Sequence, residues 1–313
     1  MRPCIIIAGP TGSGKTLVAA ELALMAGGEI ISADSRQVYK YLDAGTNKSG
    51  TLDKNGMRVF KGVKQHLTDI LEPGEHFSAG SFAEKASEKI TSLKNSKLTP
   101  IIAGGTGLYI KSLVDGLAPM PEQNPEIREN LAAALKKYGK EHLYKKLKSV
   151  DPQAAEKNRG NPQRIIRALE VFLITGIPIT ELHKNTKPSK EKFVQFGLRW
   201  EKAELYPMLD GRCVKMAGSG MIDETKKVLE MGFDGGCPAL ESLGYNRIVD
   251  FLKGSITLDT AIEAFKTDTR HYAKRQMTWF NKDKRVNWID LNAKNFNPAA
   301  IAGRIVKELP NLL

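Results

Sequence analysis

Short apolar runs alternate with amphipathic stretches along most of this chain. The apolar runs predict buried strands at residues 5–7, 29–32, 100–103, 193–200 and 286–289. The helical spacing of apolar residues predicts helices at 17–25, 82–93, 108–114, 205–214, 258–280 and 299–309. Strands that alternate with helices in this way are typical of an α/β fold with a parallel sheet.

The pattern changes between residues 118 and 185, where helix signals replace strand signals. Three pairs have the form of a helix N-cap followed by proline, and they are Asn124-Pro125, Asp151-Pro152 and Asn161-Pro162. Gly139 and Gly176 follow two of the helical patterns and predict where those helices end. We therefore predict a small all-helical insertion domain at 118–185, within an α/β core formed by 1–117 and 186–313.

Residues 40–80 show neither a strand period nor a helix period. They are rich in glycine, lysine and aspartate, so the sequence predicts long loops. These loops would lie over the edge of the sheet where the strands end.

The junction between the first predicted strand and the first helix carries the clearest chemical signal. Gly9, Gly14, Lys15 and Thr16 complete the pattern G-x-x-x-x-G-K-S/T. In that arrangement backbone N–H groups and a helix N-terminus bind phosphate, the lysine neutralises charge and the hydroxyl faces Mg²⁺. We predict a P-loop NTPase-like parallel sheet flanked by helices. The loop alone does not identify the phosphate compound.

Two further polar positions follow predicted strands. Asp34 comes just after the strand at 29–32, and Thr106 lies in a Gly-rich turn after the strand at 100–103. Because the carboxyl ends of parallel strands collect at one edge, both residues should open onto the same crevice as Lys15. The carboxylate of Asp34 could ligate Mg²⁺, accept a proton or cap a helix, and local sequence leaves these roles open.

Basic residues recur on several predicted helices. Arg212 lies near the apolar stripe of its predicted helix. It could be an ordinary surface residue, or it could bind phosphate if the helix borders the crevice. Arg164 and Arg167 share one face of the last insertion helix. Residues 266–285 hold seven Lys and Arg against two acids. These helices are candidate nucleic-acid contacts, although solvated basic faces have the same pattern.

Composition supports a polyanionic partner without requiring one. The 313 residues include 47 Lys and Arg against 35 Asp and Glu, for a formal charge of +12. The excess fits lysine-rich surface decoration, or binding to RNA or DNA ahead of a membrane. We expect a cytoplasmic protein, because no apolar run approaches a membrane span and cleavage of a signal peptide would remove the phosphate loop. Cys4, Cys213 and Cys237 form no C-x-x-C pair and indicate reduced, mostly buried thiols.

Taken together, the motifs resemble those of the bacterial tRNA dimethylallyltransferases, also called tRNA isopentenyltransferases. The resemblance is carried by G-P-T-G-S-G-K-T at 9–16, D-S-R-Q-V-Y-K at 34–40, G-G-T-G-L-Y at 104–109, N-P-Q-R-I-I-R-A-L-E at 161–170 and A-K-R-Q-M-T-W at 273–279. These segments occur in order over nearly the whole chain. Departures from the family pattern at Gly80-Ser81, Ser49 and Cys213-Val214 fall in loops and helix caps.

The resemblance implies a specific reaction. A dimethylallyl group would move from dimethylallyl diphosphate to N6 of the adenosine beside the tRNA anticodon, giving N6-isopentenyladenosine and diphosphate. Asp34 would take the proton from N6, and Thr16 and Arg212 would complete the catalytic set, with Thr16 also a ligand of Mg²⁺.

The resemblance also implies two sets of binding residues and a monomeric enzyme. The diphosphate or a nucleotide would be bound by Gly9, Pro10, Thr11, Gly12, Ser13, Gly14, Lys15, Thr16 and Thr106. The tRNA anticodon stem-loop would be bound by Asp34, Ser35, Arg36, Gln37, Gln163, Arg164, Ile165, Ile166, Arg167, Lys274 and Arg275.

Other functions fit the residues without the resemblance. A P-loop kinase of a nucleotide or small metabolite would use the same loop for ATP, with Asp34 and the insertion arginines in its active site. A non-catalytic RNA-binding NTPase switch is a third class, although the chain has no convincing guanine-specificity motif. A free adenine nucleotide is a variant acceptor, and the basic segment 266–285 argues against it.

Overall fold

Residues 3–309 of a computed structural model are described here, and the chain divides into two compact units. An α/β unit consists of the chain up to Val114 and from Lys190 onward, and a helical unit consists of Asp115–Ser189. The sequence-based boundaries at 118 and 185 lie within four residues of this division.

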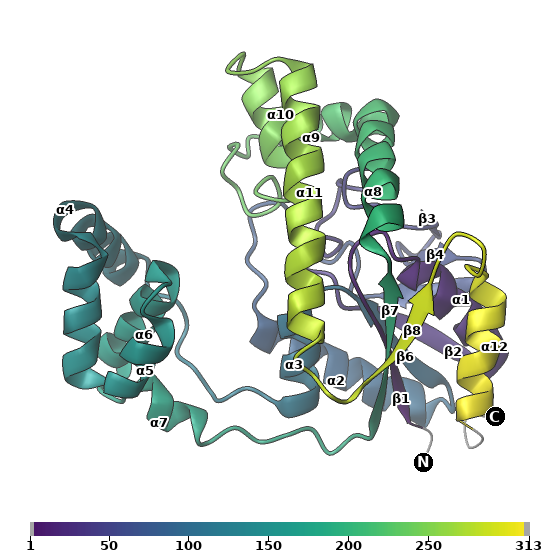
Figure 1. Ribbon diagram of the computed structural model, residues 1–313, viewed down its shortest axis with the longest axis horizontal. Helices are drawn as coiled ribbons and strands as arrows, with labels where there is room; N and C mark the ends of the chain where they lie inside the picture. The colour runs from purple at the N-terminus through teal and green to yellow at the C-terminus, as the bar shows by residue number, and fades with distance from the viewer. Residues whose placement is uncertain (1–2, 310–313) are drawn as a thin grey trace. The chain divides into compact units, whose positions relative to one another are not determined.

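An eight-stranded sheet forms the centre of the α/β unit (Figure 1). Its order is β3-β4-β5-β2-β6-β1-β7-β8. The six strands that pair in parallel are β5 (Val63–His66), β2 (Gly28–Ser32), β6 (Thr99–Gly104), β1 (Cys4–Ala8), β7 (Phe193–Trp200) and β8 (Val286–Leu291). All five predicted strands are present, and the predicted α/β class with a parallel sheet is confirmed.

The prediction of loops alone for residues 40–80 was wrong, because β3 (Thr51–Leu52), β4 (Arg58–Phe60) and β5 extend the sheet there. Charged groups stabilise this edge. Buried Arg58 donates from Nη2 to Oδ1 of Asp43 at 2.8 Å and from Nε to Oδ2 of Asp69 at 2.7 Å. These strands are only two to four residues long, and charged side chains stabilise them beside the apolar contacts of Val63 and Phe60, so no hydrophobic period marks them in the sequence.

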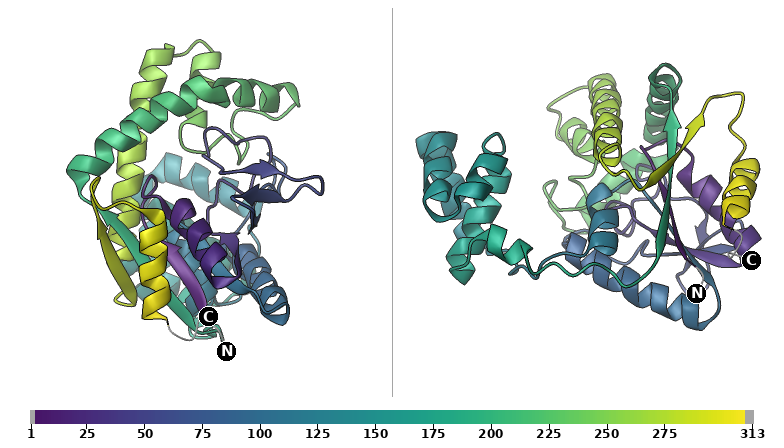
Figure 2. Two further views of the ribbon diagram at one scale, coloured as in Figure 1. Left: turned by 90° about the vertical axis from the view of Figure 1, so that its right-hand side faces the viewer. Right: turned by 60° about the horizontal axis from the view of Figure 1, so that its bottom comes forward.

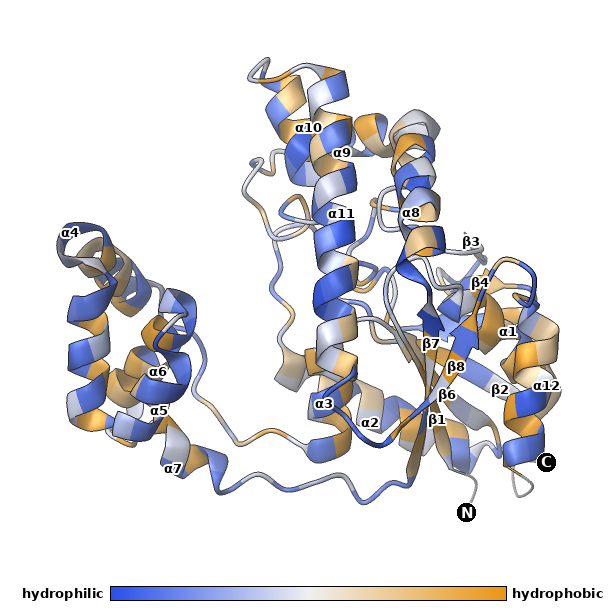
Figure 3. Cartoon of the chain, viewed as in Figure 1, coloured by the Kyte–Doolittle hydropathy of each residue, from blue (hydrophilic) through white to orange (hydrophobic). Residues whose placement is uncertain are grey.

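Helices cover both faces of the sheet (Figures 1 and 2). One face is covered by α1 (Lys15–Ala26) and α12 (Pro298–Glu308), and the other by α2 (Ala79–Asn95) and α3 (Gly107–Asp115). Alternate residues of β1 serve the two faces, because Ile5 and Ile7 pack in one core cluster and Ile6 in the other. Figure 3 accordingly shows the central strands as strongly hydrophobic, whereas the helices carry both colours.

A second group of helices lies beyond the carboxyl ends of the parallel strands (Figures 1 and 2). It comprises α8 (Lys202–Met216), α9 (Ile222–Glu230), α10 (Tyr245–Leu252) and α11 (Leu258–Phe280). Only α8 and α11 were predicted. A π-helical turn at Ala217–Met221 joins α8 to α9. A third core cluster, which includes Met216, Tyr245 and Phe265, ties these helices to the loop after β2.

The helical unit contains α4 (Pro125–Val150), α5 (Pro152–Asn158), α6 (Pro162–Thr175) and α7 (Ile179–His183). The three predicted N-caps are confirmed, since Asn124, Asp151 and Asn161 each accept a hydrogen bond from a backbone N–H in the first helical turn. The predicted helix end at Gly139 is confirmed, since this residue has non-helical angles of φ 77° and ψ 173° and α4 consists of two helices that meet at a kink there. Among the described residues, no helix is long and apolar enough to cross a membrane.

A buried carboxylate joins α4 to α6. Glu170 is fully buried and accepts hydrogen bonds from Arg128 Nε at 3.0 Å, Arg167 Nη1 at 2.7 Å and the backbone N–H of Asn124 at 2.8 Å. Burial raises the pKa of Glu170, but these hydrogen bonds outweigh it and the pKa is lowered. Glu170 therefore stays ionised and fixes the start of α4 against α6.

Candidate active site

The phosphate loop connects β1 to α1 at the carboxyl edge of the sheet. Gly12 and Gly14 have φ angles of 76° and 84°, which favour glycine over other residues. Gly14 caps α1 without any side-chain hydrogen bond. Glycine has no side chain that could accept hydrogen bonds from the first N–H groups of α1. These N–H groups are therefore free to bind an anion.

Lys15 crosses the loop and is poised for an anion. Its Nζ donates to the carbonyl of Pro10 at 2.6 Å. Burial lowers the pKa of Lys15 to about 8, the charge of Asp34 opposes this shift, and the charge of Arg212 adds to it. A bound diphosphate would offset the burial of the Lys15 ammonium and its repulsion by Arg212, because it supplies negative charge and charge-assisted hydrogen bonds.

Arg212 extends from α8 toward the same loop. Burial lowers the pKa of its guanidinium, and the charges of Cys213 and Asp34 oppose the shift. Its Nε is buried without a hydrogen-bond partner among the described residues. Leu209, one turn earlier, packs so closely on Gly12 that a Cβ there would lie 2.5 Å from its Cδ2. An unpaired donor beside the phosphate loop is where an anion oxygen would bind.

Asp34 lies on the opposite side of this cleft, just after β2. Its Oδ1 accepts a hydrogen bond from the N–H of Arg36 at 2.9 Å, so the carboxylate closes a turn. Oδ2 accepts no hydrogen bond from any described residue. The side chain therefore serves as a local cap and still presents one oxygen to the cleft.

Thr106 supports the Asp34 segment and does not line the cleft. Its Oγ1 accepts from the N–H of Ser35 at 3.1 Å, and its own N–H donates to the carbonyl of Ala33 at 3.2 Å. It also hydrogen-bonds the hydroxyl of Tyr272, whose pKa burial and the charge of Asp34 raise to about 12. Thr106 thus supports the segment of Asp34, and its contact with diphosphate stays a prediction.

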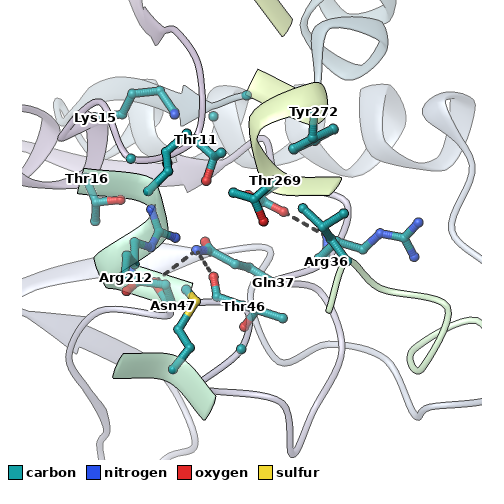
Figure 4. A pocket seen from close by; sticks show the side chains of 18 of the residues that line it. Thr11, Lys15, Thr16, Arg36, Gln37, Thr46, Asn47, Arg212, Thr269 and Tyr272 are labelled. Atoms are coloured by element: carbon teal, nitrogen blue, oxygen red, sulfur yellow. Dashed lines mark hydrogen bonds between the residues drawn. The ribbon is translucent and has the colours of Figure 1, made fainter. Parts of the chain in front are cut away.

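The remaining residues of the D-S-R-Q segment take different directions. Gln37 lines the cleft, accepting from Ser32 Oγ at 3.1 Å and donating to the carbonyl of Thr46 at 3.2 Å (Figure 4). The guanidinium of Arg36 donates from Nη1 to the carbonyl of Pro238 at 3.1 Å. Hydrogen bonds at both Oε1 and Nε2 therefore fix the orientation of the Gln37 side chain in the cleft wall.

The cleft has a volume of about 420 Å³ and continues from the cationic loop into an apolar region. This region is lined by α8, α11 and Leu243 before α10, and of these elements sequence analysis had assigned only Arg212 to the cleft. The residues of this region are Met208, Leu209, Cys213, Met216, Leu243, Phe265 and Thr269. The only sequence signal for it was the helical spacing of these residues, which is also the spacing of an ordinary core. The cleft could therefore bind a molecule that has phosphate groups at one end and an apolar chain at the other.

The predicted nucleic-acid contacts fall into two groups. Gln163 and Arg164 are exposed on α6, and Lys274 and Arg275 are exposed on α11. Ile165 and Ile166, in contrast, pack in the core of the helical unit, and Arg167 pairs with Glu170 and donates to the carbonyl of Pro121 at 2.8 Å.

This placement corrects the predicted tRNA-binding set. The side chains of Ile165 and Ile166 are not on the surface of α6, because they form the apolar face that holds the unit together. The pattern Q-R-I-I-R mixes two faces of one helix, and only the positions of Gln163 and Arg164 offer exposed side chains for a partner.

The three cysteines are buried and free, as predicted. Among the described residues, no cluster of three or more His, Cys, Asp or Glu side chains could hold a metal ion without a ligand's help.

A phosphate loop at a strand-to-helix junction in a mostly parallel sheet defines an enzyme with a P-loop NTPase-like fold. The sequence model of a family described as IPP transferase matches residues 37–283. The chain belongs to this family of prenyl-transferring enzymes. It is similar to a tRNA dimethylallyltransferase of Endomicrobium trichonymphae, at 46% identity over 285 residues that cover 91% of this chain and 94% of the relative.

Two further comparisons agree. A tRNA dimethylallyltransferase of Acetivibrio thermocellus is 43% identical over 296 residues, which cover 93% of this chain and 92% of the relative. The solved structure of the full-length tRNA isopentenylpyrophosphate transferase of Bacillus halodurans matches with a TM-score of 0.70 and 34% identity, and it covers 100% of this chain and 98% of its own. The P-loop NTPase-like fold and the family resemblance are therefore confirmed.

Proposed function

We propose that this enzyme transfers a dimethylallyl group from dimethylallyl diphosphate to N6 of the adenosine adjacent to the anticodon of tRNA, with release of diphosphate. The observation that carries the proposal is the cleft itself. In a chain of the IPP transferase family, one cleft is lined by the cations Lys15 and Arg212 and by the carboxylate of Asp34.

The cationic side of the cleft suits the leaving group. Allylic substitution builds negative charge on the departing diphosphate, so donors that are already oriented there stabilise the transition state. Lys15, Arg212 Nε and the N–H groups at the start of α1 are such donors. Because Arg212 Nε has no described protein partner, this donor need not break a hydrogen bond to bind substrate.

The carboxylate side suits the acceptor. An adenine amino group is a weak nucleophile and becomes positively charged as it attacks the allylic carbon. We propose that Oδ2 of Asp34 accepts a hydrogen bond from N6 and then its proton, while Oδ1 stays in the turn with the N–H of Arg36. The hydrogen bonds of Thr106 to both sides of Asp34 hold the carboxylate in place.

Mg²⁺ is part of the proposal as a cofactor. Thr16 lines the cleft at the start of α1 together with Asp34, and oxygen donors of this kind with phosphate oxygens are what Mg²⁺ prefers. When bound, the ion would neutralise charge on the diphosphate. Thr16 is the residue that would hold it.

The tRNA would reach the cleft with its target base extruded from the anticodon loop, since an enzyme cannot alter a stacked base in place. We propose that Gln37 contacts this base from the cleft wall. Exposed Arg164 on one unit, and Lys274 and Arg275 on the other, would contact the sugar–phosphate backbone. The proposal includes a monomer that acts in the cytoplasm, where its three buried thiols would stay reduced.

The P-loop kinase hypothesis has no support from the comparisons, because the relatives are named for prenyl transfer to tRNA. A label-transfer experiment tests both functions at once. Dimethylallyl diphosphate labelled in its carbon chain and γ-labelled ATP are each offered with Mg²⁺ and unmodified tRNA, AMP or no acceptor. We expect carbon label in tRNA alone; turnover of the γ-phosphate without carbon transfer would refute the proposal.

The role of Asp34 has a matched control in the chain. Asp34→Asn keeps an oxygen for the turn and removes the base, so kcat should fall by about 10²–10⁴-fold. Asp234 forms the same kind of turn, accepting from the N–H of Gly236 at 2.5 Å, and it does not line the cleft. Asp234→Asn should leave kcat within twofold. A kcat of Asp34→Asn within twofold of wild type would assign Asp34 to the turn alone.

A further inference from the structure

One side-chain amide connects the two Gly-rich turns of the α/β unit. Gln276 on α11 is buried, its Oε1 accepts from the N–H of Thr11 at 2.8 Å, and its Nε2 donates to the carbonyl of Gly105 at 2.8 Å. Thr11 belongs to the phosphate loop and Gly105 to the turn after β6. Both contacts use the strongest donor and acceptor of the side chain, so the amide is held in one orientation.

The turn after β6 is shaped to receive α11. A Cβ on Gly105 would lie 2.2 Å from Gln276 Nε2, and a Cβ on Gly107 would lie 2.2 Å from Cδ1 of Trp279. The Cβ at Gly105 would also approach the carbonyl oxygen of Gly9, at 3.2 Å. The glycines therefore allow α11 and the phosphate loop to pack directly on this turn.

The same turn supports the segment that carries Asp34. Thr106 follows Gly105 and hydrogen-bonds the backbone on both sides of Asp34, at Ala33 and Ser35. A continuous path of hydrogen bonds thus runs from Thr11 through Gln276, Gly105 and Thr106 to the backbone around the carboxylate.

We infer that Gln276 is a positioning residue that sets the separation between the phosphate loop and Asp34. This inference rests on the proposed function, in which the two sides of the cleft hold the leaving group and the acceptor. The reaction needs the allylic carbon and N6 within near-attack distance, and a displacement of about 1 Å costs roughly 100-fold in rate. Gln276 also lines the cleft, but its amide oxygen and nitrogen are both bonded to the two loops, so we propose that it acts through them and not on the reacting atoms.

The inference predicts which kinetic parameter changes. Gln276→Met keeps the length and the burial of the side chain but removes both hydrogen bonds. Each loop keeps its own binding groups, so the KM for tRNA should stay within about threefold. The distance between the loops is no longer fixed, so kcat should fall by roughly 10–100-fold.

A matched control separates positioning from the loss of any buried glutamine. Gln195 on β7 is 3% exposed against 6% for Gln276, and its Nε2 donates to Asp283 and not to either loop. Gln195→Met should lower stability to a similar degree and leave kcat within twofold. Melting temperatures of both variants, measured by circular dichroism, check that the enzymes compared are folded at the assay temperature.

A second variant approaches the same contact from the other side. Gly105→Ala places a Cβ where Nε2 of Gln276 lies, and thus breaks the contact without changing the glutamine. If the two residues act through one contact, the double variant should lose no more activity than the worse single variant. Gly105→Ala also decides the question if Gln276→Met does not fold.

The outcomes are distinct when carbon-labelled dimethylallyl transfer to tRNA is the assay. A fall in kcat of at least fivefold in Gln276→Met or Gly105→Ala, with Gln195→Met unaffected, supports the inference. A smaller fall, an equal fall in the control, or multiplicative losses in the double variant would overturn it. Absence of transfer by the wild-type chain would overturn the proposed function, and this inference with it.

Discussion

The hydroxyl of Tyr245 lies at the centre of the contact between α10 and the loop after β2, and we predict that its removal destabilises the α/β unit. The side chain is fully buried. Its hydroxyl donates to Glu224 Oε2 at 2.5 Å and accepts from the N–H of Gly45 at 2.9 Å. The other oxygen of Glu224 accepts from the N–H groups of Asp43 and Ala44. Burial, followed by the charge of Glu224, raises the pKa of Tyr245 well above its usual value, so the hydroxyl keeps its proton.

The magnitude follows from the two lost hydrogen bonds. Tyr245→Phe leaves the Gly45 N–H unpaired and removes one donor from a carboxylate, at a combined cost of about 3 kcal/mol. For a unit of this size, about 3 kcal/mol lowers the melting temperature by about 6–12 °C. Gly45 and Thr46 line the cleft, and the carbonyl of Thr46 holds Gln37. We therefore also expect a lower kcat/KM for tRNA at a temperature where both proteins are folded.

Differential scanning calorimetry and the transfer assay together check this prediction. Tyr206→Phe is the control, because Tyr206 is in the same unit and its hydroxyl has no hydrogen-bond partner among the described residues. The control should melt within 1–2 °C of wild type, since an unpaired hydroxyl contributes little. If Tyr245→Phe also melts within 2 °C of wild type, the contact does not stabilise the loop and the reasoning is refuted.

Three further predictions concern charge. The pKa of Lys15 is about 8 in the free chain, and diphosphate should raise it by favouring the ammonium. The ionisation of Lys15 should then leave the affinity for diphosphate unchanged below pH 8 and weaken it above pH 8. Calorimetry at pH 8.5 in two buffers should show proton uptake on binding, and Lys15→Met should show none. Replacing Lys274 and Arg275 by alanine should flatten the dependence of tRNA affinity on salt by about one unit of slope per lost phosphate contact, measured by filter binding, and an unchanged slope would contradict contact with the backbone. Glu170→Ala should destabilise the helical unit by about 3–5 kcal/mol, seen as faster hydrogen exchange in α4 and α6, while exchange in β1 stays unchanged.

The sequence predicted those parts of the fold that apolar periods determine. The strands that became β1, β2, β6, β7 and β8 each contain a run of apolar residues, and the three proline-marked caps of the helical unit need only local contacts. The phosphate loop was predictable for the same reason, because its glycines, lysine and threonine act within eight consecutive residues. Asp34 was found from its place after a strand, since the topology of a parallel sheet brings such positions together.

The parts that the sequence did not predict depend on partners distant in the chain. The ion pairs of Arg58 with Asp43 and Asp69 help to hold the short strands β3 to β5, and such pairs give no hydrophobic period. In α6, the family motif could not separate exposed Arg164 from Arg167. Arg167 pairs with Glu170 one turn later, and Glu170 is buried there because it also accepts hydrogen bonds from Asn124 and Arg128 at the start of α4. The apolar wall of the cleft has the spacing of an ordinary helical core, and only the fold turns it toward the phosphate loop.

The two Gly-rich turns have similar sequences but need glycine for different physical reasons. In the phosphate loop, Gly9, Gly12 and Gly14 all have positive φ, so glycine is needed there for the backbone conformation. In the turn after β6, none of the three glycines has positive φ; they are small because the backbone of Ala33, the amide of Gln276 and the ring of Trp279 pack where side chains would be. Protein atoms also pack against the phosphate loop, since a Cβ on Gly14 would lie 2.3 Å from Cζ of Phe296, so the two turns differ in backbone conformation and not in being closely packed. A glycine pattern therefore marks a close approach, but what approaches is decided by residues far away in the sequence. Here α11 fills the second turn, and this contact lets a helix with an exposed basic face fix the position of the phosphate loop.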